Sequence, residues 1–336
     1  MRRRDGVALV VVLVFVLLLT SQIATFMRRA TVDAMISRHH DAAAEAEALA
    51  RGGVRLAVSL LLEDRLQEEA VQFRVESPLD AWARVDQVPV SEDGEASLRL
   101  RIQDAGSRFN LNALVDGEGA ARKNAELVLV ALLEKVIGEI PADQPAGVYD
   151  PRELARELLD FIDRDEVRSN GGSEDAYYQR QTPPYKAANR PLLSLEELRM
   201  VEGFDGVLME ALEPYLTVHP QAGGDGINPN TAPAHVLGLL YHGVSEEYRL
   251  ADAEQVADVL ALRETGGIWC DETASHEGCH PLAEVVPGEI YPPPSFTASV
   301  FTVVSRATVG EVTRSVEAVL DRGELPAITL LAWRTR

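Results

Sequence analysis

The pattern of hydrophobic and polar positions opens with an uncharged segment, residues 7–27, in which residues 7–19 are all aliphatic or phenylalanine. At about 1.5 Å per residue, a helix over this segment would be about 30 Å long, which matches the hydrocarbon core of a bilayer. A cleaved secretory signal is the competing interpretation, but Gln22 and Ala24 stand where a cleavage site needs two small residues. The pattern therefore predicts a membrane-spanning helix, and the basic residues before it favour a cytoplasmic start.

Helical sequence continues beyond the apolar segment. No proline occurs in residues 28–74, and residues 42–50 are rich in alanine, so one helix is predicted over about residues 7–65. A bend is expected at Gly52 and Gly53, because each glycine costs about 1 kcal/mol relative to alanine in a helix. Apolar residues at helical spacing mark the side that packs against the rest of the protein, and these are Leu49, Leu56, Ala57, Leu60 and Leu61.

The remaining pattern has strands at both ends and helices between them. Alternation of apolar and polar residues predicts a strand at 97–103. Helical periodicity predicts helices at 120–140, 153–161, 195–202, 231–241 and 251–264, the third with a capping box of Ser194 and Glu197 and the fourth capped by Asn230 or Thr231. Strands return at 299–304, 312–320 and 328–333. The predicted fold class is α+β, with a helical insertion that interrupts an antiparallel sheet.

The charge of the chain narrows the classes of partner. Asp and Glu number 53 against 32 Lys and Arg, which gives a formal net charge of -21. Proteins bind phosphate backbones through Lys and Arg, so nucleic acid is a poor partner for this chain. The acidic excess either serves solubility alone or is used in part to hold cations.

One acidic segment has the spacing of a cation-binding loop. It begins with D-x-D and has a carboxylate at the twelfth position; the candidate ligands are Asp163, Asp165, Glu174, Asp175 and, one helical turn earlier, Asp160. Calcium prefers such hard oxygen ligands, and the Gly- and Asn-containing residues 169–172 can bend to assemble them. An EF-hand is excluded, because Val167 and Arg168 occupy its fifth and sixth positions. The residues predict a calcium loop of another kind, with a solvated acidic turn as the alternative.

The two cysteines, Cys270 and Cys279, lie in one loop. Outside the cytoplasm such a pair is typically a disulfide, which in the chain-entropy model would stabilise the fold by about 2 to 3 kcal/mol. A zinc site with His276 and His280 is the alternative, although the usual C-x2-C or H-x3-H spacing is absent. A second, weaker calcium site would use the acidic residues of the same loop, Asp271, Glu272, Glu277 and Glu284.

Two segments, 195–216 and 227–262, are predicted as paired short helices similar to helix-hairpin-helix DNA readers. Those readers need Lys or Arg beside phosphate, and the first pair offers only Arg199 among four acidic residues. A module for protein contact is the better interpretation. The sequence contains no nucleophile elbow, H-E-x-x-H motif or Walker loop, so we predict no catalytic residue and no enzymatic activity.

The N-terminus resembles the class III signal of type IV pilins and type II secretion pseudopilins. A short basic leader ends in Gly6, and the hydrophobic helix starts at Val7. The resemblance implies that a prepilin peptidase cuts after Gly6 and that Val7, which replaces the usual Phe, is then methylated. The fifth mature position is Val11, where the family usually has a Glu that pairs with the amine of a neighbouring subunit. A subunit without this Glu resembles the type K minor pseudopilin.

Five further segments, in the same order along the chain, carry the resemblance to type K: RFNLNAL (108–114), LLDFIDRDE (158–166), GGSEDAYY (171–178), NRPLLSLEELRMVEGF (189–204) and INPNTAPAHVLGLL (227–240). The resemblance implies a pilin-like fold, in which the long helix packs on an antiparallel sheet, with a large all-α insertion of SAM-like or helix-hairpin subdomains. It also implies that the helical domain binds calcium through the segment from Asp163 to Glu174.

The implied function is that of a minor pseudopilin at the tip of the periplasmic pseudopilus, which supports export of folded proteins by the type II secretion system. The expected partners are minor pseudopilins of types I and J, the major pseudopilin, the prepilin peptidase and secreted substrates. The expected location is the inner membrane, with a single span and a periplasmic C-terminal domain. A DNA-binding competence-type protein and a calcium-dependent extracytoplasmic enzyme are the alternatives.

The chain divides accordingly. The expected parts are a leader (1–6), the membrane part (7–27) and periplasmic part (28–75) of the helix, the first part of the sheet (76–112), the helical insertion (113–292, divided near 220) and the last strands (293–336).

Overall fold

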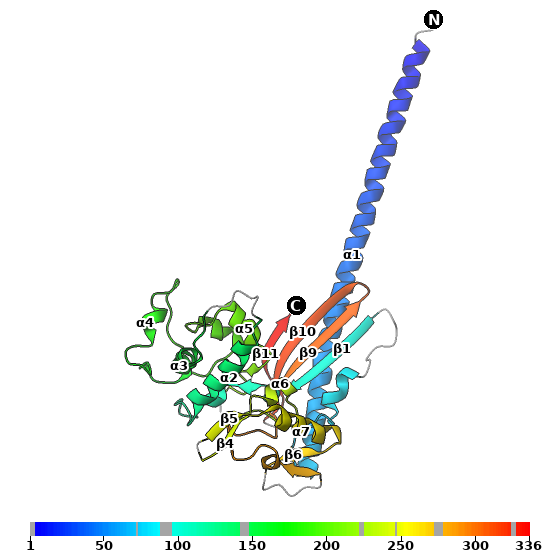
Figure 1. Ribbon diagram of the computed structural model, residues 1–336. Coiled ribbons are helices and arrows are strands. Elements are labelled where there is room, and N and C mark those ends of the chain that lie inside the picture. Colours follow the sequence, from blue (N-terminus) through cyan, green and yellow to red (C-terminus); the bar gives the residue numbers. More distant parts are fainter. Residues whose placement is uncertain are drawn as a thin grey trace.

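One helix of 68 residues, α1 (Arg4–Val71), forms the N-terminal part of the molecule and extends far beyond the head (Figure 1). The computed structural model describes residues 4–71, 73–87, 96–141, 148–221, 225–245, 247–271, 278–323 and 327–336, with side chains in the first range from residue 9. The helix continues through Gly52 and Gly53 without interruption. Its residues 9–41 are exposed, so only its C-terminal part packs against the head.

The contact side of α1 is a stripe of small and aliphatic residues, Ala46, Ala50, Val54, Ala57 and Leu61, all buried. Their spacing of three and four residues follows the helical repeat, and the small side chains let the sheet approach the helix closely. The predicted contact side is confirmed at Ala57 and Leu61. The other predicted contact residues lie half-buried beside the stripe, and these are Leu49, Leu56 and Leu60.

A four-stranded antiparallel sheet packs against this stripe (Figure 1). Its order is β1-β9-β10-β11, formed by β1 (Ala96–Asp104), β9 (Val300–Val309), β10 (Val312–Asp321) and β11 (Thr329–Thr335). All four predicted strands are therefore confirmed. Phe301 of β9 lies in the centre of the core, edge-on to Trp82 of η1 (Trp82–Gln87) with ring centroids 5.0 Å apart. Burying such aromatic side chains stabilises the fold by about 1.5 to 3 kcal/mol each.

Between β1 and β9 the chain leaves the sheet and builds a second hydrophobic core. Its first half contains η2 (Ala105–Ser107), β2 (Phe109–Asn110), η3 (Leu111–Leu114), α2 (Ala125–Glu139), α3 (Pro151–Ile162), α4 (Asp175–Tyr178), η4 (Leu195–Met200), α5 (Gly206–Leu212) and β3 (Leu216–Thr217). Its second half contains α6 (Ala234–Leu237), β4 (Tyr241–Val244), β5 (Glu247–Leu250), α7 (Ala253–Glu264), β6 (Ile268–Cys270), β7 (Cys279–Pro281), η5 (Leu282–Glu284) and β8 (Glu289–Tyr291).

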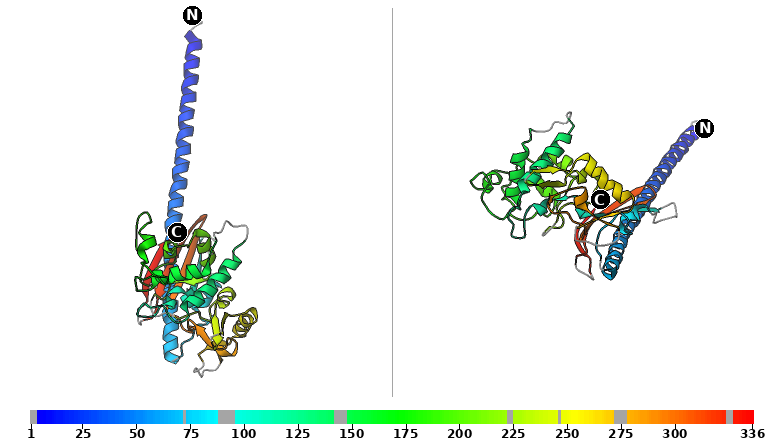
Figure 2. Two further views of the ribbon diagram at one scale, coloured as in Figure 1. Left: turned by 60° about the vertical axis from the view of Figure 1, so that its left-hand side comes forward. Right: turned by 60° about the horizontal axis from the view of Figure 1, so that its bottom comes forward.

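The insertion lies beside the sheet and beyond its lower end in Figure 1, and it is far from the N-terminus of α1 in all views (Figures 1 and 2). The α+β fold class, with a long helix on an antiparallel sheet and a large insertion, is confirmed. The residue boundaries of the domains, including the division near 220, stay predictions.

Three local predictions are wrong. The insertion is not all-α, because β5, β4 and β8 form a three-stranded sheet. The helix predicted at 231–241 ends after α6, since the apolar run that follows forms the buried strand β4, and a short apolar run does not distinguish helix from strand. Ser194 makes no side-chain cap on η4, and the Glu197 of the predicted box instead pairs with Arg190 at 3.0 Å.

Candidate metal centre

The predicted calcium loop begins where α3 ends. Asp150 caps the start of this helix by accepting a hydrogen bond from the Arg152 amide at 2.9 Å. The residues on one side of α3 are buried in the second core, so its last turn is held in place; these are Leu154, Leu158, Phe161 and Ile162. Asp163 is the C-cap residue and starts the loop.

The loop then folds back on itself. Val167 and Ser173 form an isolated antiparallel bridge. Between them Gly171 and Gly172 have φ values of 88° and 105°, which side chains other than glycine rarely adopt. The turn returns the chain toward α3, and Glu174 thereby comes back to Asp163.

Asp163, Asp165 and Glu174 are brought together by this turn. One carboxylate oxygen of each lies within 4.8 Å of the others. Glu174 is only 3% exposed. Asp163 Oδ1 and Glu174 Oε1 are buried and have no hydrogen-bond partner among the described residues. Buried carboxylate oxygens without a partner are costly unless a proton or a cation neutralises them.

The pKa values of two carboxyls in this cluster are raised, because they are buried and lie close to other negative charges. Burial, followed by the charge of Asp165, raises the pKa of Asp163 to about 6. Burial, followed by the charge of Asp163, raises the pKa of Glu174 to about 7. Crowded carboxylates in a poorly solvated place take up protons, and the same oxygens suit a hard cation that replaces those protons.

The other two predicted ligands differ from each other. Asp160 is 4% exposed and accepts hydrogen bonds from the Ser169 amide, at 3.1 Å to Oδ2, and from the Ser169 hydroxyl. It therefore shapes the loop beside the cluster. Asp175 is directed elsewhere, since it pairs with Lys186 at 3.2 Å and accepts from the Ala187 amide. The structure thus brings together three of the five predicted ligands.

Asn189 is part of the centre although nothing in the sequence singled it out. Its Nδ2 donates to Glu174 Oε2 at 3.1 Å and to the backbone carbonyl of Asp165. Its φ of 46° is left-handed, a conformation that Asn tolerates better than most residues. Asn189 lies fifteen positions beyond Glu174, so the contact depends on how the intervening chain returns to α3.

The second predicted calcium site can be followed only in part. Asp271 and Glu284 are described, whereas Glu272 and Glu277 lie outside the described residues. In the part of the chain that the structure describes, no group of potential metal ligands contains Asp271 or Glu284. That site stays a prediction.

A second acidic cluster was not predicted from the sequence. Asp64, Glu76 and Asp80 approach one another within 4.8 Å. They lie beside Arg322, which is 1% exposed and donates to Asp64 Oδ2 at 2.6 Å. The Arg322 position is separated from Glu76 by 246 residues, and no local motif links the two.

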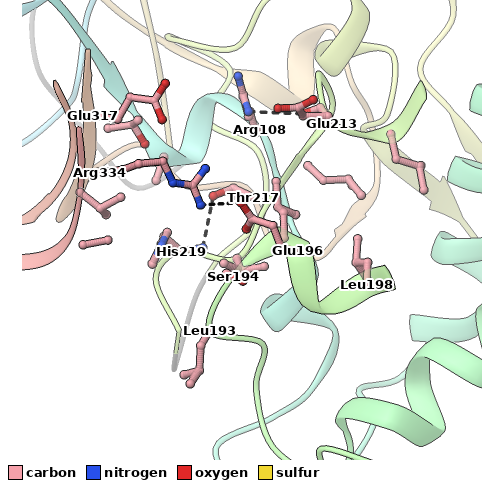
Figure 3. Close-up of a pocket in the computed structure, with 18 of the residues that line it drawn as sticks. Arg108, Leu193, Ser194, Glu196, Leu198, Glu213, Thr217, His219, Glu317 and Arg334 are labelled. Atoms are coloured by element: carbon pink, nitrogen blue, oxygen red, sulfur yellow. Dashed lines mark hydrogen bonds and ion pairs between the residues drawn. The ribbon is translucent and has the colours of Figure 1, made fainter. Parts of the chain in front are cut away.

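A groove of about 670 Å³ runs between the sheet and the insertion (Figure 3). Arg334 of β11 crosses it and pairs with Glu196 of η4 at 2.7 Å, which lowers the pKa of Glu196. Arg108 donates to the Glu213 carbonyl at 3.3 Å on the insertion side. Both partners of the Arg334 pair are about half exposed, so this bridge contributes at most about 1 kcal/mol to holding the insertion against the sheet.

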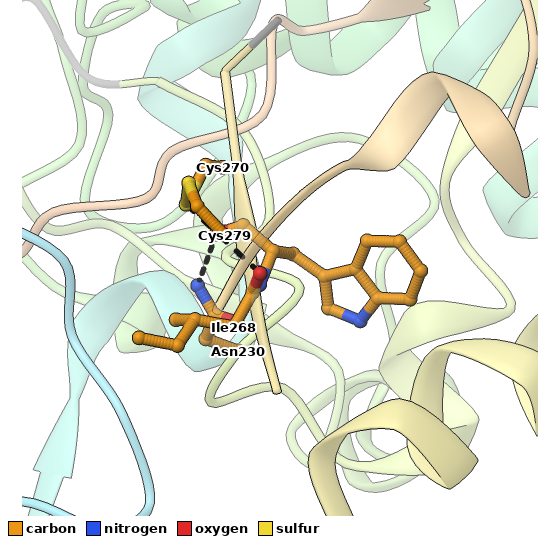
Figure 4. Close-up of a disulfide and its surroundings, with 5 residues drawn as sticks. Asn230, Ile268, Cys270 and Cys279 are labelled. Atoms are coloured by element: carbon orange, nitrogen blue, oxygen red, sulfur yellow. Dashed lines mark hydrogen bonds between the residues drawn. A yellow bond between two sulfur atoms is a disulfide. The ribbon is translucent and has the colours of Figure 1, made fainter. Parts of the chain in front are cut away.

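Cys270 and Cys279 form a disulfide with Cα atoms 5.7 Å apart, as predicted (Figure 4). It joins the parallel strands β6 and β7. Asn230 holds the first of these strands, since its Oδ1 accepts from the Trp269 amide at 2.8 Å. The zinc alternative is wrong for these sulfurs, because zinc ligation requires thiolates. His276 lies outside the described residues.

Comparison with known proteins identifies the family. A family profile described as type II secretion system (T2SS), protein K, matches residues 107–221. The type II secretion system protein K of Pectobacterium carotovorum is 30% identical over 278 residues, covering 79% of this chain and 80% of the relative. That of Aeromonas hydrophila is 27% identical over 337 residues, covering 98% and 96%. The chain belongs to the type II secretion system protein K family.

A solved structure has the same fold as this protein K family member. A chain in the crystal structure of the GspK-GspI-GspJ complex from the enterotoxigenic Escherichia coli type 2 secretion system aligns with a TM-score of 0.63 at 22% identity. The match covers 89% of this chain and 99% of the other. Membership in the family makes this chain a minor pseudopilin, a structural component of the type II secretion system, as the resemblance implied.

The alternatives find no support. Residues 227–262 contain α6, two strands and α7 rather than a helical hairpin, so the second half of the predicted DNA-reading pair does not form. The comparisons return protein K relatives and give no indication of a competence protein or an enzyme.

The N-terminal helix of this protein K family member fits a membrane anchor. Residues 9–71 belong to the one described helix that is long and apolar enough to cross a bilayer, and none of its most apolar part is buried. Val11 is 60% exposed on this helix. Gly6 and Val7 lie in α1, and their side chains are not described.

Proposed function

We propose that this chain is the tip subunit of a pseudopilus, anchored by α1 in the inner membrane, with its head in the periplasm. The observation that carries this proposal is the position of the insertion. Its second half, with β4 to β6 and α7, lies at the end of the head opposite the N-terminus of α1, and its first half, with α3 to α5, extends sideways past the sheet (Figure 1). A further subunit added on the side away from the membrane would collide with the insertion. Subunits on the membrane side would instead contact the exposed part of α1.

The exposed part of α1 supports an assembly role. Residues 9–41 have no contacts that bury them within the chain, and they include aliphatic residues well past the apolar segment, such as Val32 and Ile36. An apolar helical surface of this length is stable when it lies in lipid or packs on neighbouring helices. We propose cleavage by a prepilin peptidase after Gly6, with methylation of Val7, as the step that prepares this helix for assembly.

The partners proposed are minor pseudopilins of types I and J and the major pseudopilin. The solved structure of similar fold is that of a protein in complex with GspI and GspJ. We propose that the present chain forms the corresponding complex and thereby supports the export of folded proteins across the outer membrane.

Calcium is proposed as the ion of the Asp163 cluster. The residues fit the ion, because three carboxylates converge and two of their buried oxygens have no partner among the described residues. Asp163, Asp165 and Glu174 would hold it, with Asp160 adding negative charge nearby. Calcium would neutralise the cluster and tie the end of α3 to the start of α4, so that the loop keeps one conformation.

The tip position can be tested by imaging. Pseudopili are assembled from the full secretion system with an epitope tag on the C-terminus of this chain, and labelled with gold-conjugated antibody. We expect label at one end only, whereas the tagged major pseudopilin, as a control, labels the whole length. Label distributed along the length, or failure of the chain to co-purify with the type I and J subunits, would contradict the proposal.

A further inference from the structure

The turn that follows α1 carries a buried acidic cluster with an unusual charge balance. Asp64 comes from α1, Glu76 from the segment after it and Asp80 from the turn before η1. Glu68 of α1 lies beside them, because Arg322 contacts its Oε1 at 3.5 Å. Glu76 is 1% exposed, and the side chains of Asp64 and Glu68 are 13% and 11% exposed.

Two arginines face these four carboxylates. Arg322 donates to Asp64 Oδ2 at 2.6 Å and to Glu76 Oε1, and Arg65 lies 3.6 Å from Glu68 Oε2. Arg65 is shared with Glu69 at 3.3 Å, and the charge of Arg74 also acts on Glu68, so when every group is ionised five negative charges meet three positive ones. The excess is the charge that one divalent cation neutralises, and in a place this poorly solvated an uncompensated charge is expensive.

The carboxylates present oxygens that their neighbours do not use. Arg322 and the Ala298 amide both take Oε1 of Glu76, while its Oε2 is buried without a hydrogen-bond partner among the described residues. Arg322 donates a hydrogen bond to Oδ2 of Asp64, and the Ser77 amide donates one to Oδ2 of Asp80 at 2.7 Å. Each of the three carboxylates thus has one oxygen fixed by a donor, which orients the group, while its second oxygen accepts no hydrogen bond from the residues that the structure describes.

We propose that Asp64, Glu76 and Asp80 form a second divalent-cation site, separate from the Asp163 loop. Hard carboxylate oxygens are the ligands that calcium prefers. The ion would bind the oxygens that Arg322 does not contact, so Arg322 keeps its hydrogen bonds to Asp64 and Glu76. The ion ties the end of α1 to the turn that follows it, because its ligands come from these two segments. Burial raises the pKa of Glu76 to about 9 and that of Asp80 to about 7, because both carboxylates are poorly solvated.

The test counts calcium ions bound to the full-length chain in detergent by isothermal titration calorimetry after treatment with chelator. Glu174→Gln disables the Asp163 loop, and we expect one ion to remain bound in that variant. Adding Asp80→Asn to this variant should abolish binding of the remaining calcium ion. Adding Asp258→Asn instead, at an exposed acidic position on α7, is the matched control and should leave binding of that ion unchanged. Absence of calcium from the Glu174→Gln chain, or retention of the ion after Asp80→Asn, overturns the proposal.

The same experiment separates this site from the calcium loop. If the loop does not bind calcium, wild-type chain and Glu174→Gln each bind one ion, and Asp80→Asn alone abolishes binding. If the variants of this cluster fail to fold, hydrogen exchange in the Glu174→Gln chain decides the matter. Calcium should slow amide exchange in residues 73–87 several-fold, and an unchanged rate overturns the proposal.

A proton on Glu76 is the competing way to reduce the charge. Glutamine mimics a protonated glutamate, so in that case Glu76→Gln would bind as much calcium as the parent chain, which also overturns the proposal. A cation site instead requires that Glu76→Gln weakens calcium binding at least tenfold.

Discussion

Glu174 is buried beside Asp163 and Asp165, so its carboxyl holds a proton more tightly than a carboxyl in water does. Because its pKa is raised from 4.5 to about 7 in the folded chain, the folded state binds more protons than the unfolded state between these values. The free energy of unfolding of calcium-free protein should therefore fall as pH rises through this window and level off above it.

Calcium should reverse this loss, since the ion replaces the protons. We expect the rise in melting temperature caused by calcium to be larger at pH 8 than at pH 5.5, and Glu174→Gln to lose the part that the loop contributes. Differential scanning fluorimetry measures both. Glu166→Gln, an exposed position in the same loop, is the control and should behave as wild type. An equal effect of calcium at both pH values would count against ligation by these carboxylates.

Arg322 supports the fold as a buried counter-charge. It is 1% exposed, contacts Asp64, Glu68 and Glu76, and lies over the Phe301 ring at 4.6 Å. Arg322→Met should lower the free energy of unfolding by about 3 to 5 kcal/mol, because it leaves buried carboxylates without their partner.

Urea denaturation without added cations measures this effect. Arg306→Met, at an exposed position on β9, is the matched control and should change stability by no more than about 0.5 kcal/mol. Equal losses in the two variants would show that the buried pairing of Arg322 contributes nothing specific.

At the scale of elements, the two adjacent glycines of α1 differ in their surroundings. A Cβ at Gly53 would lie 2.2 Å from the Ser305 hydroxyl oxygen and 3.1 Å from its Cβ, whereas a Cβ at Gly52 would have no atom within 4 Å. Gly53 thus allows α1 to approach β9 closely. Helix propensity alone, by contrast, treats both glycines as equally unfavourable.

Alanine substitutions separate propensity from packing. Gly52→Ala should raise the free energy of unfolding by up to about 1 kcal/mol, as expected for an exposed helical glycine. Gly53→Ala should lower it by about 1 to 3 kcal/mol, because overpacking forces the helix and the sheet apart. Chemical denaturation of the two single variants provides the comparison. Stabilisation by both would mean that the helix and sheet can separate without cost.

For the assembled molecule, the proposed tip role rests on Val11, which stands where the pseudopilins that the N-terminus resembles usually have a Glu, as well as on the insertion. Val11→Glu would supply a group for pairing with the amine of a neighbouring subunit. We expect the variant to enter the pseudopilus away from its end, as judged by gold labelling of the tagged chain. Leu13→Glu introduces the same charge nearby and controls for the cost of a carboxylate in the membrane. Normal tip position and secretion in Val11→Glu would show that the absence of this charge is incidental.

The elements with local signals could be predicted from the order of residues alone. The apolar segment of α1, the alternation of β1, β9, β10 and β11 and the D-x-D spacing before Glu174 all lie within short windows of the chain. Their interpretation was confirmed for the helix, the strands and the convergence of Asp163, Asp165 and Glu174. Binding of calcium by that cluster stays a prediction.

Contacts between residues far apart in the chain became known from the folded structure. In the folded chain Asn189 donates to Glu174, and Asp175 pairs with Lys186 instead of joining the cluster. The apolar run at Tyr241 forms a strand. Arg322 pairs with Asp64 and Glu76. These contacts depend on where the chain reverses and on which groups are buried, and a local sequence pattern shows neither. Burial matters because an uncompensated charge is strongly destabilising when it is removed from water. Composition showed an excess of acidic residues, and the fold concentrated part of that excess in two poorly solvated clusters, where a carboxylate needs a proton, an arginine or a cation.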